Sequence, residues 1–86
     1  MNLKWEQLNE TMWQTQTKTR HFQISKSGNV WELIEVLERL HSDSHMYAYL
    51  SNTKSLVTAK SLIKKFNEGK IYFDEKCRPR EKVCEQ

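Results

Sequence analysis

Two stretches of the chain carry apolar residues with the spacing of an amphipathic helix. Over residues 30–40, apolar side chains recur three or four positions apart, with glutamates on the other side. This spacing is typical of a helix that packs one face against a core. Asn29 stands before the stretch and Glu32 three residues after it, as in a capping box. We therefore predict a first helix whose stripe consists of Val30, Leu33, Ile34, Leu37 and Leu40.

The segment "NTKSLVTAKSLIKKFNEGK" shows the same helical spacing over residues 56–66. Thr53 or Ser55 can accept hydrogen bonds from the amides of the first turn, and Gly69 can occupy the position after the last turn. We predict a second helix here, with an apolar stripe of Leu56, Ala59, Leu62, Ile63 and Phe66.

Three other segments are typical of strands. Thr and aromatic residues alternate in places over 13–25, and 46–50 ("MYAYL") and 70–74 ("KIYFD") are short and aromatic. The order strand, helix, strand, helix, strand predicts an α+β fold. We expect a two-layer open-faced sandwich, in which two helices cover one face of a short antiparallel sheet.

Composition agrees with one small domain over residues 1–86. The chain has 37% hydrophobic and 29% charged residues, a normal globular balance, and 86 residues can bury one modest core. We expect an N-terminal extension at 1–12, an α+β core at 13–74 and a charged tail at 75–86. No apolar run is long enough to cross a membrane, and the first ten residues lack the apolar core of a signal peptide, so we expect a cytoplasmic protein.

Charge is distributed unevenly along the chain. Residues 1–52 carry five Lys or Arg and six Asp or Glu, which is −1, whereas residues 53–86 carry nine and five, which is +4. A basic half can attract nucleic acid, although a solvated lysine surface explains the same charge. The residues that would contact nucleic acid are Lys60, Lys64, Lys65, Lys70, Arg78 and Arg80.

The sequence offers no motif for catalysis. Six residues separate Cys77 from Cys84, more than in a zinc knuckle, so we expect no zinc site there even with His41 and His45 as further ligands. A disulfide between the two cysteines would close only a short terminal loop, so we expect free thiols. There is no Gly-rich phosphate loop and no nucleophile motif. We expect no enzyme activity, no cofactor, no metal and no small-molecule substrate.

Several short strings resemble the histidine-containing phosphocarrier (HPr) family of the bacterial sugar phosphotransferase system. "HFQISKSGN" looks like the first strand and its turn, "VWELIEVLERLHSD" like the first helix with its Ser-Asp exit, and "TKSLVTAKSLIKKF" like the region of the regulatory serine. The resemblance covers roughly residues 20–73 and places Lys54 and Ser55 on the family's lysine and regulatory serine. Residues 28–32 supply no phosphorylatable histidine, so such a relative would be unable to carry phosphate on histidine.

The resemblance implies a regulatory module that binds another protein, with phosphorylation of Ser55 as its control. Docking in that family uses an apolar patch after the serine, here Leu56 and Val57 with Lys60 in its middle. Trp31, beside the first stripe, is a further candidate binding anchor.

Two alternatives stay open at this point. The first is a small basic nucleic-acid-binding protein of the type found in phages and mobile elements. The second is a resemblance to double-stranded-RNA-binding domains, which requires "NVWELIEVL" to be a strand, and the capped helical stripe of that segment speaks against it.

Overall fold

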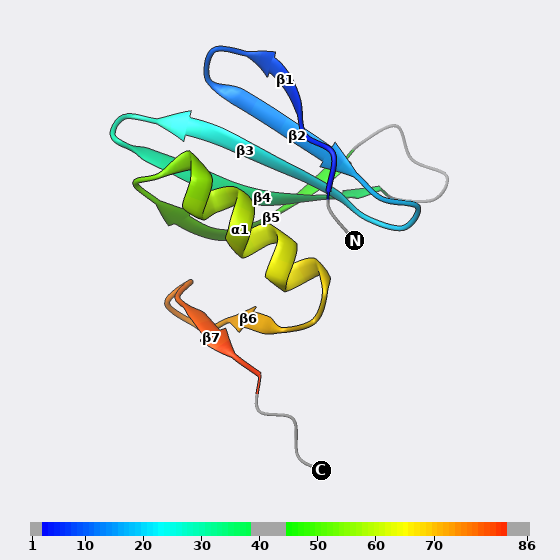
Figure 1. Ribbon diagram of the computed structural model, residues 1–86, viewed down its shortest axis with the longest axis vertical. Helices are drawn as coiled ribbons and strands as arrows, with labels where there is room; N and C mark the ends of the chain where they lie inside the picture. The colour runs from blue at the N-terminus through cyan, green and yellow to red at the C-terminus, as the bar shows by residue number, and fades with distance from the viewer. Residues whose placement is uncertain (1–2, 39–44, 83–86) are drawn as a thin grey trace.

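Strands are the predominant secondary structure of the described residues. The structure, a computed structural model, describes residues 3–38 and 45–82, and within them it contains seven strands and one helix. The elements, labelled in Figure 1, are β1 (Glu6–Asn9), β2 (Met12–Gln16), β3 (His21–Ser27), β4 (Val30–Glu38), β5 (His45–Thr53), α1 (Leu56–Asn67), β6 (Ile71–Phe73) and β7 (Pro79–Glu81).

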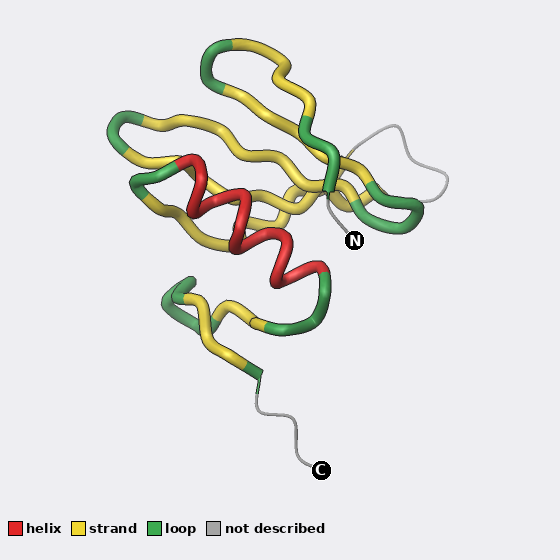
Figure 2. The backbone as a smooth tube through the Cα atoms, in the orientation of Figure 1, coloured by secondary structure: helices red, strands yellow, loops and turns green. Residues whose placement is uncertain are grey.

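The first five strands form one antiparallel sheet in chain order. Each strand pairs with the strand before it, so the order across the sheet is β1-β2-β3-β4-β5. α1 then crosses one face of this sheet, which we call the helix face, and we call the opposite face the open face (Figures 1 and 2). β6 and β7 pair with each other in a separate two-stranded hairpin beyond α1.

The expected sandwich with two helices is wrong, because the first predicted helix is β4. Residues 30–38 are extended and paired on both sides, with β3 and with β5. The turn explains the difference: Gly28 and Asn29 alone separate Ser27 from its partner Val30. Gly28 has a φ of +61°, the left-handed value that the first position of a type II′ hairpin turn requires. Asn29 therefore lies in a hairpin turn instead of capping a helix.

The other predicted elements have mixed outcomes. The helix over 56–66 is confirmed as α1, and the strands over 46–50 and 70–74 are confirmed as β5 and β6. The segment 13–25 contains two strands, β2 and β3, joined by a turn. The expected extension contributes β1 to the sheet, and β7 lies in the expected tail. Leu40 and His41 lie outside the described residues.

The core lies between α1 and the helix face. Register places Phe22, Ile24 and Leu33 on neighbouring positions of β3 and β4, and all three are fully buried. Ala59 and Ile63 of α1 are also fully buried against them. Burying each large apolar side chain contributes about 1.5–3 kcal/mol relative to leaving it exposed, so this contact holds the single helix on the sheet.

Two buried hydroxyl groups attach the outer segments to this core. Thr15 of β2 is 2% exposed and donates a 2.6 Å hydrogen bond to the carbonyl of Lys4. Ser51 of β5 is equally buried and donates to the carbonyl of Cys77, in the turn between β6 and β7. A buried hydroxyl needs such a partner, and both find it in segments that adjoin the sheet.

Candidate functional site

Ser55 is the N-cap of α1. Its backbone is extended, and its hydroxyl accepts a 3.4 Å hydrogen bond from the amide of Thr58. This confirms one of the two caps expected from the sequence, and it gives Ser55 a structural role. Phosphorylation of this exposed serine stays a prediction. The described residues do not form the HPr-like arrangement of two helices that suggested it.

The residues predicted to bind protein lie near the first half of α1, but they are not equally available. Val57 is 77% exposed, whereas Trp31 and Leu56 are half-buried and pack against the core. Lys60 is held over aromatic rings: its Nζ lies 3.6 Å from the centre of the Trp13 ring and 5.9 Å from that of Trp5. A lysine in this position is attracted by the negative faces of both rings. Trp31, Leu56 and Lys60 therefore contribute mainly to stability, and Val57 is the exposed member of the set.

The basic residues predicted to contact nucleic acid are dispersed, and most of them already have partners. Lys60 faces tryptophans, and the Nζ of Lys70 lies 3.5 Å from a carboxylate oxygen of Glu68. Arg78 and Arg80 both reach Asp74 of their own hairpin, at 3.5 and 3.0 Å. Lys64 and Lys65 occupy the last turn of α1, as expected for cations near the negative end of a helix dipole.

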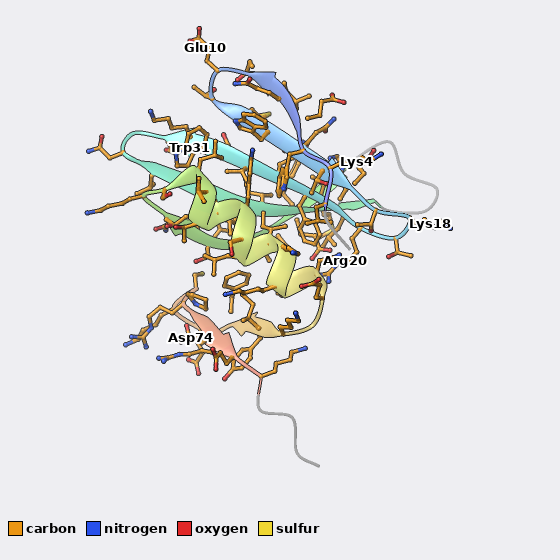
Figure 3. All side chains as sticks on the ribbon, viewed as in Figure 1. Lys4, Glu10, Lys18, Arg20, Trp31 and Asp74 are labelled. Atoms are coloured by element: carbon orange, nitrogen blue, oxygen red, sulfur yellow. The ribbon has the colours of Figure 1, made fainter. Side chains whose placement is uncertain are left out.

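Asp74 organises the hairpin of β6 and β7. Its carboxylate accepts from the amides of Lys76 and Arg78, at 2.9 Å each, and from Nε of Arg80 at 3.0 Å. These hydrogen bonds, that of the Arg78 amide above all, lower the pKa of Asp74 to about 2, because they favour the charged form. Figure 3 shows Asp74 well separated from Arg20 and Trp31, so the labelled side chains of these three do not converge on one site.

Sequence reasoning missed an ion pair at the other end of the sheet. Arg20 donates two hydrogen bonds to the carboxylate of Glu35, at 2.8 and 2.9 Å, and its guanidinium lies 4.7 Å from the centre of the Phe66 ring. The hydrogen bond to Glu35 raises the pKa of Arg20 above its usual value. An open groove of about 330 Å³ adjoins this pair at the turn between β2 and β3. The groove is also lined by His21, whose Nε2 lies 3.1 Å from Oε1 of Gln14, so the charged and the ring groups at this end of the sheet are both held by neighbouring side chains.

The exposed apolar side chains of the described residues concentrate on β4 and β5. Tyr47 is 62% and Tyr49 46% exposed on the open face, beside Val36 and Ile34. On the other face, Met46 and its cross-strand partner Leu37 are also more than two-fifths exposed. The edge strand β5 therefore presents large apolar groups on both of its faces.

β5 also has the composition of an internal strand. From His45 to Thr53 it contains no Lys, Arg, Asp, Glu or Pro, although edge strands usually carry charges or proline that discourage further pairing. Among the described residues, β4 is the only strand that pairs with β5. The opposite edge differs: β1 has four residues, begins with Glu6 and is irregular between Gln7 and Asn9. We define the segment Tyr47–Leu50, with its two tyrosines, as the β5 surface.

The sequence predicted a strand at the β5 surface, but it did not predict that this strand lies at an edge of the sheet. The segment "MYAYL" indicated a strand, yet its place at the edge depends on pairing between distant segments. The available signal was a continuous apolar run, which is typical of strands covered on both faces.

Comparison with known proteins gives no relative for this chain. No family model, no curated protein and no solved structure matches it.

Neither a metal-binding cluster nor a membrane-spanning helix is present in the part of the chain that the structure describes. No group of three or more His, Cys, Asp and Glu side chains there is placed to hold a metal ion. Among the same residues, no helix has the length and apolar character needed to cross a bilayer. Cys77 is half-buried, and Cys84 and the side chain of His45 lie outside the described part.

Proposed function

We propose that this protein is a non-enzymatic binding module that engages another polypeptide through the β5 surface. The observation that carries the proposal is the mismatch between composition and position: β5 is uncharged and apolar on both faces, yet it lies at the edge of the sheet. The amide and carbonyl groups along such an edge are available to an additional strand. Main-chain hydrogen bonds would supply affinity, and Tyr47 and Tyr49 would supply side-chain contacts.

Tyrosine suits this role because of its size and rigidity. A tyrosine contributes a large apolar area and a hydroxyl group while few rotamers are lost on binding, and tyrosines are enriched among interface hot spots. Two such side chains lie on the same face of β5, two positions apart, so one partner strand could contact both.

The alternative that the protein binds nucleic acid has less support, because most of the basic side chains that would contact phosphates have partners within the chain. Lys60, Lys70, Arg78 and Arg80 are engaged within the chain by rings or carboxylates. The described residues of the β5 surface itself carry no cation.

A capture experiment with two matched variants tests the proposal. The immobilised protein is incubated with an extract of its own host cells. It is compared with the double variant Tyr47→Lys/Tyr49→Lys and with Tyr72→Lys, which changes a tyrosine on β6 that is about as exposed as Tyr49. We expect the specific partner to be retained by the wild type and by Tyr72→Lys and to be lost with the double variant.

A second measurement, of binding to nucleic acid, can contradict the proposal. Retention on double-stranded DNA or RNA that falls with salt and disappears in Lys64→Glu/Lys65→Glu, while Tyr47→Lys/Tyr49→Lys has no effect, would refute the proposal. Capture of the same proteins by the wild type and the tyrosine double variant would refute it as well.

A further inference from the structure

The ammonium group of Lys60 lies between two tryptophan rings on the helix face. Its Nζ is 3.6 Å from the centre of the Trp13 ring and 5.9 Å from that of Trp5. Both distances are within the range in which the negative face of an aromatic ring attracts a cation. The ion pairs among the described residues join other lysines and arginines to carboxylates, whereas Lys60 interacts with these rings. We call Trp5 and Trp13 the tryptophan pair, and together they form a site that holds an ammonium group.

The tryptophan pair is held in place by the fold of the sheet. Trp13 lies in β2 opposite Ile24 of β3, which is fully buried. Trp5 follows Lys4, whose carbonyl accepts the 2.6 Å hydrogen bond from the buried hydroxyl of Thr15. Both rings pack against the core and are partly exposed. The site is therefore preformed, and a ligand that enters it does not have to order it.

Lys60 reaches the site from the flank of α1 and can leave it by rotation of its own side chain. It follows Ala59, which is fully buried, and one step along a helix turns the side chain by about 100°. Lys60 therefore extends from the side of α1 to the ring on β2, and it is only half-buried. Val57 and Ser61 of the same helix are exposed. Rotation about the bonds of the lysine stem returns the ammonium group to water, with loss of the ring contacts alone.

The geometry of the site suits a larger ammonium group than that of Lys60. The nitrogen is close to the Trp13 ring, but its distance from Trp5 is longer than a bare ammonium group in direct contact requires. Methyl groups on the nitrogen would bring a ligand into contact with both rings. A methylated ammonium group is also hydrated more weakly than an unmethylated one, so it loses less when it leaves water. Aromatic cages that recognise methyl-lysine and choline combine these two effects.

We propose that the tryptophan pair is a binding site for a trimethylated lysine side chain of another polypeptide, and that Lys60 occupies this site until the ligand displaces it. The structure favours a lysine over a choline headgroup because the occupant that it shows is the end of a lysine side chain. Exchange replaces one cation at the rings by another, and Lys60 moves into water, which screens its charge. The site shares no residue with the β5 surface, so this inference goes beyond the proposed function and does not depend on it.

Titration of the full chain with Nα-acetyl-trimethyl-lysine amide tests the site. The indole NMR signals of Trp5 and Trp13 report binding, and that of Trp31, which lies under Lys26, is the internal reference. Two ring contacts correspond to a dissociation constant of about 1 mM when the site is empty. We expect this value for Lys60→Ala and about tenfold weaker binding for the wild type, in which the tethered lysine competes for the rings.

Lys65→Ala is the matched control, because it removes an exposed lysine from the same helix and should bind as the wild type does. A gain of affinity in Lys60→Ala cannot result from misfolding, so it supports displacement. Equal dissociation constants for Lys60→Ala and the wild type, or unchanged signals of Trp5 and Trp13 in both proteins, would overturn the proposal.

Related ligands test the chemistry that the site recognises. Nα-acetyl-lysine amide, and a neutral analogue with a quaternary carbon in place of the methylated nitrogen, should each bind Lys60→Ala at least about tenfold more weakly than the trimethylated compound. Equal binding of the neutral analogue would identify an apolar pocket and refute recognition of a cation. If phosphatidylcholine vesicles change the two indole signals and the trimethyl-lysine compound does not, the ligand is a lipid headgroup and the proposal is wrong.

The double variant Tyr47→Lys/Tyr49→Lys separates this site from the proposed function. We expect it to bind the trimethyl-lysine compound with the wild-type dissociation constant, because the β5 surface is not part of the tryptophan pair. If the double variant loses this binding, the compound is not held by the tryptophan pair and the inference fails. Capture of a partner through the β5 surface is a separate measurement, and no result with Lys60→Ala decides it.

Discussion

Removal of the Arg20 guanidinium should destabilise the fold far more than removal of an exposed lysine. The substitution Arg20→Met keeps an unbranched apolar stem but deletes both hydrogen bonds to Glu35 and the stacking on Phe66. The side chains of Arg20 and Glu35 are 31% and 13% exposed, so the pair lies between a surface pair and a buried one. Surface pairs contribute about 0–1 kcal/mol, and breaking a buried pair costs about 3–5 kcal/mol. We therefore expect a loss of about 2 kcal/mol in the free energy of unfolding, or roughly 10 °C in Tm for a domain of this size.

Urea unfolding followed by tryptophan fluorescence measures this loss, and Lys70→Met is the matched control. Lys70 is 68% exposed and 3.5 Å from Glu68, so its substitution should cost less than about 0.5 kcal/mol. A double-mutant cycle with Glu35→Gln should give a coupling energy of about 1 kcal/mol or more between the two groups. If Arg20→Met is no more destabilising than Lys70→Met, the argument from partial burial and paired hydrogen bonds is wrong.

Three further predictions concern other contacts of the fold. Ile63→Ala should lower the free energy of unfolding by about 2–5 kcal/mol because Ile63 is fully buried. Val57→Ala, at a position that is 77% exposed, should lower it by less than about 0.5 kcal/mol. If urea unfolding gives equal losses for the two variants, the described packing of α1 is wrong. The pKa of Asp74 falls from 3.8 to about 2 in the folded chain, so its contribution to stability is full above pH 4 and is lost as pH falls towards 2. The NMR amide shifts of Lys76 and Arg78 should titrate in that window and be flat in Asp74→Asn, and a midpoint near 4 in the wild type would speak against the hydrogen-bonded carboxylate. Lys60→Met should cost about 0.5–2 kcal/mol by loss of the contact with Trp13 and should alter tryptophan emission, unlike Lys65→Met; identical emission in the two variants would refute the ring contact.

The sequence predicted α1 correctly because its N-cap, its apolar spacing and its C-terminal residues all indicate a helix with the same ends. Ser55 caps the helix, lysines occupy its last turn, and Gly69 follows it with a φ of +76°. Each of these signals depends on a few neighbouring residues, so the sequence alone was sufficient to place the element.

The same reasoning failed over residues 30–38 because the segment satisfies two patterns. Leu33, Ile34 and Leu37 have helical spacing, but Trp31 and Leu33 also alternate along one face of a strand that packs beside Phe22 and Ile24. Gly28 and Asn29, two residues between runs of strand-forming residues, were the hairpin signal that should have decided between them.

The candidate site depended on information that a single sequence does not hold. The segment 46–50 was predicted as a strand, but whether a strand lies in the middle or at the edge of a sheet is set by which distant segments pair. The pairing of Arg20 with Glu35 follows in the same way from the register of β3 with β4.

The chain-order pairing of β1 to β5 has a consequence for biosynthesis. Each of these strands meets a neighbour that left the ribosome just before it, so the sheet can assemble on a nascent chain through short loop closures. The apolar residues of its helix face, including Phe22, Ile24 and Leu33, then stay exposed to solvent until residues 56–67 emerge, form α1 and pack against them. The packing of residues 56–67 on the sheet is therefore the step that removes these side chains from solvent.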